Sequence, residues 1–332
     1  MTGTKSVNAA IVGLGRWGQN LVNAAMSDPT NTLKFTRAVT RTPAKAQSFC
    51  DSHALPLSAD FGDLLQNPDI QAIVLATPHS QHADQIKLAA KAGKHVFVEK
   101  PLALTLSEGL DVSAACDAAN VVLAVGFNRR FLPAYRALEK LLISGDLGQP
   151  LHAEGNFSGP FGYDYSGDMW RGTISENPAG GMAAMGIHVL DAMIHLLGPI
   201  SHVTARSSRR VLKAPIDDTT TILLDFSSGV TGSLTTIMAT ATNWRLQIFG
   251  STGWVAMRDQ RKLEWSTLNN EVQSRRFETA DTLAMELDAF GKTILGIGEY
   301  PVTLSEALAG VAAMHAIARS ASEPKLGSCV LV

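Results

Sequence analysis

Apolar residues in the first 126 positions follow two alternating patterns. Short apolar runs typical of buried strands are each followed by a segment in which apolar positions recur every three or four residues, as on one face of a helix. Strands that alternate with helices of about ten to fifteen residues predict βαβ units and a parallel sheet. The strands are expected at 7–12, 33–39, 71–76, 95–98 and 121–125, and the helices at 19–26, 43–52, 81–92 and 105–120.

The pattern changes after about residue 150. Between residues 200 and 277, β-rich runs follow one another with turn residues between them and no helical spacing, which predicts a mostly antiparallel sheet. We therefore expect an α/β domain at 1–126 and an α+β domain with an open sheet at 127–332. The strands of this second part are expected at 219–226, 230–240, 244–249 and 254–258, and its helices at 183–197, 282–295 and 303–320.

Length and composition narrow the classes of protein. A chain of 332 residues fits two domains, and its 17% of charged residues, against a usual ~25%, suggests that extra surface is buried between subunits. The net charge of −2 comes without a basic block, which argues against nucleic-acid binding. No apolar run approaches the ~20 residues of a membrane helix. Cys50, Cys116 and Cys329 are too widely spaced for a zinc ribbon or a disulfide framework, so a reducing cytoplasm is expected.

A glycine-rich turn links the first strand to the first helix. Residues 13–18 read Gly13-Leu14-Gly15-Arg16-Trp17-Gly18, the GxGxxG pattern in its required context. The first glycine allows a tight turn, the second lets the backbone approach a pyrophosphate, and the third lets helix and strand pack closely. The helix N-terminus adds free N–H groups and a partial positive charge. This context favours a Rossmann dinucleotide site over a turn that binds nothing.

The end of the second strand bears on the choice between NADP and NAD. NAD enzymes usually place an acidic side chain there for the ribose 2′-hydroxyl, but this strand ends at Thr40-Arg41-Thr42, and no Asp or Glu occurs between Asp28 and Asp51. Arg41 would attract a 2′-phosphate, and the two threonines offer hydroxyl donors. We expect NADP to be preferred; the alternative is that Arg41 is solvated and both cofactors bind.

Two further segments lie at strand ends, where ligands bind in such sheets. The run from Thr77 to His82 begins a helix after one strand, and Glu99-Lys100-Pro101 ends the next. Lys100 there could donate to a substrate oxygen, with a pKa lowered by partial burial, and Glu99 could orient it. The alternative is a surface lysine paired with Glu99.

These motifs resemble the glucose–fructose oxidoreductase/inositol dehydrogenase (Gfo/Idh/MocA) family. The resemblance includes the GxGxxG turn and the run 76–105, and it covers nearly the whole chain. It continues through GFNRRF at 126–131, GDLG at 145–148, the glycines at 180–181, GIHVLD at 186–191 and the closing segment 301–322. The family implies hydride transfer between a nicotinamide cofactor and a sugar-like polyol or its carbonyl counterpart. It also implies a homodimer or homotetramer formed through the second-domain sheet.

The resemblance assigns roles to several residues. In the family, the lysine matching Lys100 sits by the nicotinamide, and the histidine matching His188 exchanges the substrate proton. Members often carry an aspartate four residues before that histidine, where this chain has Ala184, so a partner for His188 must come from elsewhere. His79 stands where the family often has asparagine and is expected to contact the nicotinamide ribose.

Other residues have both a functional and a structural interpretation. Trp170 and Arg171 lie in a glycine- and aromatic-rich segment that could be a mobile loop over the substrate; the alternative is a loop anchor. For Arg130 we expect a structural ion pair. Asp191 and His195 share a helix face with His188, but three ligands on one helix rarely converge on one ion, so no metal site is expected. Asp191 should instead hold a backbone group or an arginine. His195 should be a packed helix histidine.

The candidates divide by role. The catalytic candidates are Lys100 and His188. The cofactor candidates are Gly13, Leu14, Gly15, Arg16, Trp17, Gly18, Thr40, Arg41, Thr42, Thr77, Pro78, His79, His82, Glu99, Lys100 and Asn128, and the substrate candidates are Lys100, Asn128, Arg129, Trp170, Arg171 and His188. Two other functions remain open: a glycosidase that oxidises its substrate transiently with tightly held NAD, and a dinucleotide-dependent sensor without catalysis.

Overall fold

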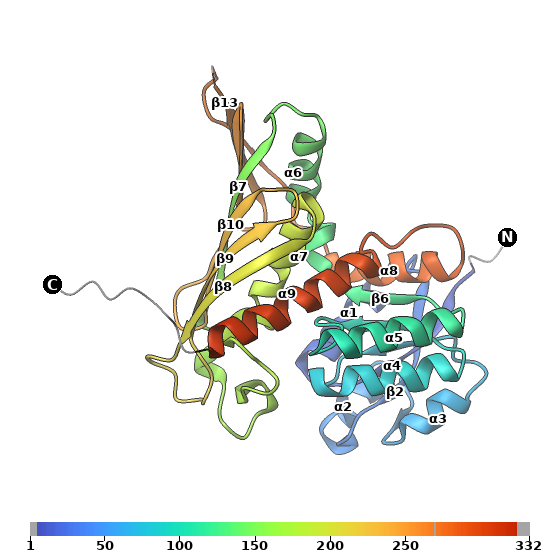
Figure 1. Cartoon of the computed structure of the whole chain (residues 1–332). Helices are drawn as coiled ribbons and strands as arrows, with labels where there is room; N and C mark the ends of the chain where they lie inside the picture. Colours follow the sequence, from blue (N-terminus) through green and yellow to red (C-terminus); the bar gives the residue numbers. More distant parts are fainter. Residues whose placement is uncertain (1–4, 269, 324–332) are drawn as a thin grey trace.

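The computed structural model describes residues 5–323 except residue 269, and Cys329 therefore lies outside the described residues. The chain forms two units that lie side by side, a parallel sheet enclosed by helices and a taller sheet that stands beside it (Figure 1). None of the helices in the described ranges is both long enough and apolar enough to cross a membrane. The two described cysteines, Cys50 and Cys116, are buried free thiols.

The first unit is a Rossmann fold. Its strands pair in parallel, as predicted, and their order is β3-β2-β1-β4-β5-β6; the sequence pattern predicted five of these six strands and missed β3. Chain order reverses between β1 and β4, and this reversal opens a ligand crevice beyond the carboxyl ends of the strands. The strands are β1 (Val7–Val12), β2 (Leu33–Val39), β3 (Leu57–Ser58), β4 (Ala72–Leu75), β5 (His95–Glu99) and β6 (Leu123–Gly126); the helices are α1 (Arg16–Ser27), α2 (Gln47–Ser52), α3 (Phe61–Gln66), α4 (His82–Lys91) and α5 (Leu106–Ala118).

The second unit is an eight-stranded sheet in the order β14-β13-β12-β11-β7-β10-β9-β8. Of its pairs, β7 with β10 is parallel and the others are antiparallel, which confirms a mostly antiparallel sheet. The sequence patterns missed α6 and the central strand β7. The elements are α6 (Pro133–Ile143), β7 (Pro150–Ser158), α7 (Gly186–Leu197), β8 (Ile200–Ser208), β9 (Thr219–Phe226), β10 (Thr231–Ile237), β11 (Asn243–Gly250), β12 (Gly253–Arg258), β13 (Lys262–Thr267) and β14 (Gln273–Arg276).

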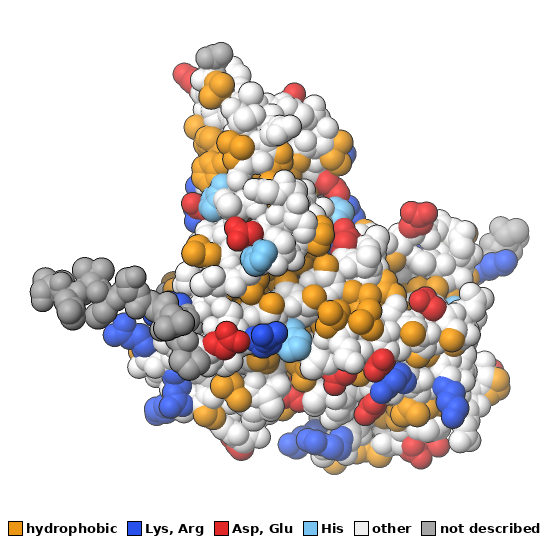
Figure 2. All heavy atoms as spheres, viewed as in Figure 1, with side chains coloured by type: hydrophobic (Ala, Val, Ile, Leu, Met, Phe, Trp, Pro, Cys, Tyr) orange, Lys and Arg blue, Asp and Glu red, His pale blue; other side chains and the backbone are white. Residues whose placement is uncertain are grey.

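Two closing helices, α8 (Thr282–Ile294) and α9 (Leu304–Ser322), join the units. α8 returns to the Rossmann fold, where Asn31 Nδ2 donates to the Ala284 carbonyl at 3.0 Å. The Phe290 ring of α8 lies 5.8 Å from the Phe97 ring of β5. α9 runs across the junction of the two units, where apolar side chains gather on the surface (Figures 1 and 2). The last helices in sequence therefore hold the two units together.

Candidate active site

The glycine-rich turn has the shape that a dinucleotide needs. Gly13 has a φ of +94°, and a Cβ atom there would lie 2.6 Å from the Ala76 carbonyl oxygen. A Cβ atom at Gly18 would lie 1.9 Å from the Gly13 oxygen, whereas one at Gly15 would meet nothing within 4 Å. Packing thus requires the first and third glycines, while the second faces open space. Since the first N–H groups of α1 lack partners within the helix, the turn fits a pyrophosphate.

The residues predicted to select the cofactor lie just beyond β2. Arg41 and Thr42 are exposed and Thr40 is half-buried. Arg41 forms no ion pair with any described residue, so its guanidinium is free to meet a ligand. No carboxylate occupies the end of β2, where an NAD enzyme usually places one.

A cavity of about 380 Å³ lies between the two units, at the carboxyl end of the parallel sheet. The residues that line this cavity come from segments far apart in the sequence. Ten of the predicted site residues line it: Arg16, Trp17, Thr77, His79, Glu99, Lys100, Arg129, Trp170, Arg171 and His188.

Lys100 reaches from the end of β5 across the junction. Its Nζ donates to the carbonyl oxygens of Ala183 and Ala184, at 3.2 and 3.0 Å. Burial lowers the pKa of Lys100 to about 8, against an opposing effect of the Glu99 charge. The lysine can therefore change its protonation state close to neutral pH, as a general acid or base must.

His188 faces the same cavity from the first turn of α7. The side chain is buried, with ring centroids of Phe127 and Phe157 at 6.3 and 6.2 Å. Burial lowers its pKa well below the ordinary value, and the charges of Lys100 and Arg129 act in the same direction. The imidazole is thus neutral at neutral pH, and no described residue hydrogen-bonds its Nδ1. The methyl side chain of Ala184 offers no acceptor, and Lys100 donates to the backbone carbonyl there.

The segment expected to cover the cavity is fastened to the Rossmann unit. Its buried Glu176 accepts hydrogen bonds from the hydroxyl and N–H groups of Ser80, and its carbonyl accepts one from His79 Nδ1 at 2.8 Å. The edge of the Trp170 ring packs on His79 with centroids 5.0 Å apart, and the Arg171 guanidinium stacks 4.1 Å from Trp170. Sequence reasoning missed Glu176, which belongs to no motif.

Two predicted site residues lie behind the cavity wall. His82 is fully buried, with its ring nitrogens 2.8 Å from the Pro101 carbonyl and 3.1 Å from the Thr77 carbonyl. It joins the start of α4 to the segment after Lys100. Asn128 donates to the Thr282 hydroxyl at 2.9 Å and accepts from Arg129 at 2.8 Å. Asn128 therefore positions Arg129, whose guanidinium lies 5.7 Å from the Phe157 ring.

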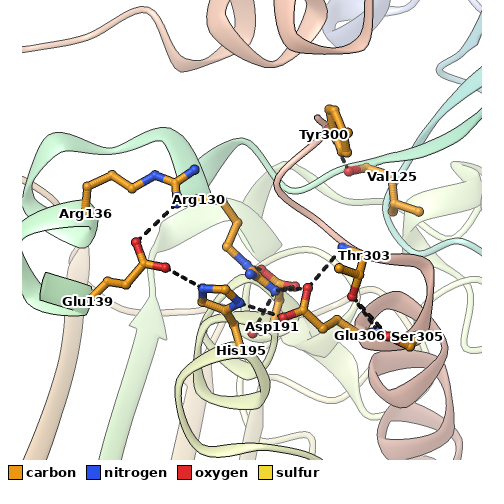
Figure 3. A network of polar contacts seen from close by, with 10 residues as sticks. All are labelled: Val125, Arg130, Arg136, Glu139, Asp191, His195, Tyr300, Thr303, Ser305 and Glu306. Carbon is orange, nitrogen blue, oxygen red and sulfur yellow. Dashed lines mark hydrogen bonds and ion pairs between the residues drawn. The ribbon is translucent and has the colours of Figure 1, made fainter. Parts of the chain in front are cut away.

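A polar network joins α7 to the 128–131 turn, α6 and α9 (Figure 3). Arg130 donates to both carboxylate oxygens of Asp191, at 2.6 and 2.8 Å, which confirms the expected ion pair. His195 is packed beside Tyr135, and its two nitrogens also lie 2.6 Å from Glu306 and 2.7 Å from Glu139, two partners that the sequence did not predict. These carboxylates raise the pKa of His195, with the Glu306 hydrogen bond as the largest cause. No group of three or more metal-ligating side chains occurs in the part of the chain that the structure describes.

The sequence analysis also overlooked Glu286 on α8. The residue is 0% exposed, and neither carboxylate oxygen has a hydrogen-bond partner among the described residues. Burial raises its pKa well above the ordinary range, and the Glu99 charge adds to the effect. The burial of Glu286 could not be predicted, because a glutamate in an amphipathic helix is ordinarily on the exposed face.

A Rossmann sheet, an open GxGxxG turn and a lysine with a lowered pKa in the adjoining crevice define the class of nicotinamide-dependent oxidoreductases. The family model described as "Oxidoreductase family, NAD-binding Rossmann fold" matches residues 7–127, and the "GFO/IDH/MocA C-terminal domain" model matches residues 135–256. The chain belongs to the Gfo/Idh/MocA oxidoreductase family.

Curated relatives agree with this assignment. The uncharacterized oxidoreductase YrbE of Bacillus subtilis is 30% identical over 269 residues, which is 78% of this chain and 75% of that protein. Levoglucosan dehydrogenase of Pseudarthrobacter phenanthrenivorans is 28% identical over 68% of this chain and 65% of its own length.

Solved structures share the whole fold. Levoglucosan dehydrogenase in complex with NADH and levoglucosan has a TM-score of 0.88 at 22% identity and covers 96% of this chain and 98% of its own. A candidate NADPH-dependent oxidoreductase from Desulfitobacterium hafniense DCB-2 has a TM-score of 0.88 at 23% identity, with 96% of both chains covered.

Proposed function

We propose that this enzyme transfers a hydride between NADP and a sugar-like polyol or its carbonyl counterpart. The observation that carries the proposal is the shared cavity of Lys100 and His188, which joins a titratable amine and a neutral imidazole beside the glycine-rich turn. Relatives named as dehydrogenases of levoglucosan and of scyllo-inositol support the substrate class.

The chain's own residues divide the work of the proposed reaction. When bound, the nicotinamide ring accepts or supplies the hydride. In oxidation, the neutral Lys100 amine accepts the proton of the reacting hydroxyl; in reduction, its ammonium form returns a proton to the carbonyl oxygen. His188 stays neutral and offers a hydrogen bond to the same part of the substrate. Trp170 and Arg171 supply a flat, cationic wall suited to a polyhydroxylated face.

A substrate panel with a lysine variant tests this function. Polyols, aldoses and ketoses are assayed with both cofactors by nicotinamide absorbance, and at least one sugar-like compound should turn over. Lys100→Met should lower kcat by about 10²–10⁴-fold, because a positioned acid–base group typically contributes that much. NADPH affinity should stay within twofold of the unmodified protein. Unchanged turnover in Lys100→Met, or tight NADPH binding with no turnover across the panel, would contradict the proposal, and the second result would favour a sensor.

The preference for NADP rests on the free Arg41 guanidinium and on the absence of an acid at the end of β2. Fluorescence titration should give a lower Kd for NADPH than for NADH. Thr40→Asp with Arg41→Ala should reverse this order, since a carboxylate repels a 2′-phosphate and accepts from a 2′-hydroxyl. Equal affinities in the unmodified protein would argue for a solvated Arg41. The binding of a nicotinamide cofactor of either kind does not depend on this test.

We also propose that the enzyme is a cytoplasmic homodimer or homotetramer. The helices pack on one face of the large sheet, while the other face carries half-exposed Phe249 and Trp254 and exposed Leu223 among polar side chains. A second copy would cover this face. Light scattering should give a mass of two or four chains, and Leu223→Asp should lower it if the face is the interface; a monomer at micromolar concentration would contradict the proposal.

A further inference from the structure

Two glutamates lie buried behind Lys100. Glu99 is 7% exposed and Glu286 is 0% exposed. Buried carboxyl groups are ordinarily ion-paired or hydrogen-bonded. Yet Glu99 Oε1 and both oxygens of Glu286 have no hydrogen-bond partner, and neither residue forms an ion pair, among the residues that the structure describes. Carboxylates left in this state would be costly, so their charge state needs a physical explanation.

The packing of α8 on β5 brings the two side chains face to face. Phe290 of α8 contacts Phe97 of β5. Glu99 lies two residues beyond Phe97, hence on the same face of the strand, and Glu286 lies one turn before Phe290, hence on the same face of the helix. Because Thr282 at the start of α8 is bonded to Asn128 just past β6, the helix runs antiparallel to the strand. Glu99 and Glu286 therefore both lie next to the Phe97–Phe290 contact, on its side toward the carboxyl end of β5.

The surroundings favour a single negative charge on this pair. Arg129 and Lys100 stabilise ionised glutamates here, whereas burial and the Asp281 charge oppose ionisation of Glu286. Tyr300, whose hydroxyl donates to the Val125 carbonyl at 2.9 Å, also faces the two carboxyls and brings no positive charge. Two carboxyl groups in one desolvated site cannot both ionise readily, so one of them keeps a proton.

Glu99 faces the cavity, and Glu286 lies in α8 five residues past the N-cap residue Asp281. Glu99 lines the cavity beside Lys100. Asp281, which is exposed, caps the N-terminus of α8 by accepting from the Ala284 N–H group at 3.0 Å. A cofactor and a substrate together would fill the cavity and separate Lys100 from bulk water. A buried carboxyl pair then offers the lysine another path to solvent.

We propose that Glu286 holds a proton and that it forms, with Glu99, a proton relay between Lys100 and the surface at the start of α8. The relay extends the function proposed above. In oxidation, the hydroxyl proton moves to Lys100 Nζ as the hydride leaves for the cofactor. No direct hydrogen bond joins Lys100 Nζ, Glu99 Oε1 and Glu286 among the described residues, so each transfer needs a bridging water. One proton passes from Lys100 to the Glu99 carboxylate, one passes from Glu99 to Glu286, and Glu286 releases its own toward Asp281 and solvent. One proton enters the relay and one leaves, and reduction runs the same steps in reverse.

Infrared spectroscopy of the full chain tests the resting proton without any substrate. At neutral pH the protein should show the carbonyl stretching band of a protonated carboxylic acid. Glu286→Gln should remove this band, whereas Glu139→Gln should keep it, because hydrogen bonds from His195 and Arg136 lower the pKa of Glu139. In the unmodified protein, labelling glutamate with a heavy isotope should shift this band. The labelling experiment can therefore take the place of Glu286→Gln if that variant does not fold. Absence of the band, or its persistence in Glu286→Gln, overturns the proposal even if the enzyme acts on another substrate.

Turnover tests the transfer itself. Glu286→Gln should lower kcat by roughly 10²-fold, in the range typical of a positioned proton carrier, with an unchanged Kd for NADPH. The solvent deuterium isotope effect on kcat should rise, because proton transfer becomes slower than the other steps. Small buffer acids and bases should restore part of the rate, which a merely structural defect would not allow. Full kcat with an unaltered isotope effect overturns the relay while leaving the proposed oxidoreductase activity intact.

Discussion

The buried position of the Lys100 amine determines its pKa. An exposed lysine has a pKa near 10.4 and is almost fully charged at neutral pH. Here burial brings the value to about 8, and the ammonium form is retained by two backbone carbonyls rather than by a carboxylate at position 184. Carbonyl oxygens hold the side chain in place yet stabilise its charge less than a carboxylate would. With only carbonyl acceptors at Ala183 and Ala184, the amine should be easier to deprotonate than it would be beside a carboxylate.

This lysine should give the reaction a single ionisation near pH 8. Oxidation needs the neutral amine, so its kcat should rise with pH up to about 8 and then level off. Reduction needs the ammonium form, so its kcat should fall over the same interval. His188 should add no step near pH 6.5, because burial keeps it neutral throughout. Profiles of kcat against pH in both directions measure this.

A matched variant separates lysine ionisation from other effects of pH. Lys100→Arg keeps a positive charge that does not titrate in this range. Its residual activity should therefore lose the step near pH 8. A step that persists in Lys100→Arg would belong to another group, and the assignment of Lys100 as the acid–base residue would be wrong.

At the scale of elements, motifs next to strand ends could be predicted, and contacts between distant elements could not. The GxGxxG turn, Lys100 and His188 were found because strand–turn–helix context or resemblance marks them locally. Glu176 and Glu286 have no such mark, since their roles depend on contacts with Ser80 and Glu99, about 100 and 190 residues away along the chain. The helix α6 and the strand β7 were missed because they lie where the pattern changes, and each packs on elements that come later in the chain.

The ion pair between the 128–131 turn and α7 should stabilise the fold by several kcal/mol, by the order of magnitude for buried pairs. Arg130→Met would leave Asp191 buried without a partner, and breaking a buried pair in this way costs about 3–5 kcal/mol. Urea unfolding measures this loss of stability. The double variant with Asp191→Leu should recover part of it, because no charge then remains unpaired.

An exposed ion pair on another element provides the control. Arg276→Met removes the exposed pair with Asp259 and should cost no more than about 1 kcal/mol. If Arg130→Met were as mild as Arg276→Met, the network in Figure 3 would contribute little to the stability of the fold.

At the scale of the whole molecule, α8 belongs in space to the Rossmann unit, which the chain forms first. It follows the large sheet in sequence, but its Leu287 and Phe290 are buried in the core of the Rossmann unit, together with Phe97 of β5. The order of elements along the chain therefore differs from their grouping in space. A boundary drawn in the sequence at residue 126 assigns to the second domain a helix that completes the first.

This arrangement should make unfolding cooperative across both units. Phe290→Ala removes a fully buried ring that contacts Phe97 and should lower the free energy of unfolding by about 3–5 kcal/mol. Trp17 reports on the Rossmann unit and Trp244 on the large sheet, so single-tryptophan versions of the protein can follow each unit separately in urea. Both signals should shift together, because α8 also packs on the 128–131 turn, whose Arg130 is ion-paired with Asp191 of α7. Met285→Ala, on the exposed side of the same helix, should shift neither midpoint measurably. A shift of the Trp17 signal alone would mean that the units unfold independently, and α8 would then belong only to the Rossmann unit.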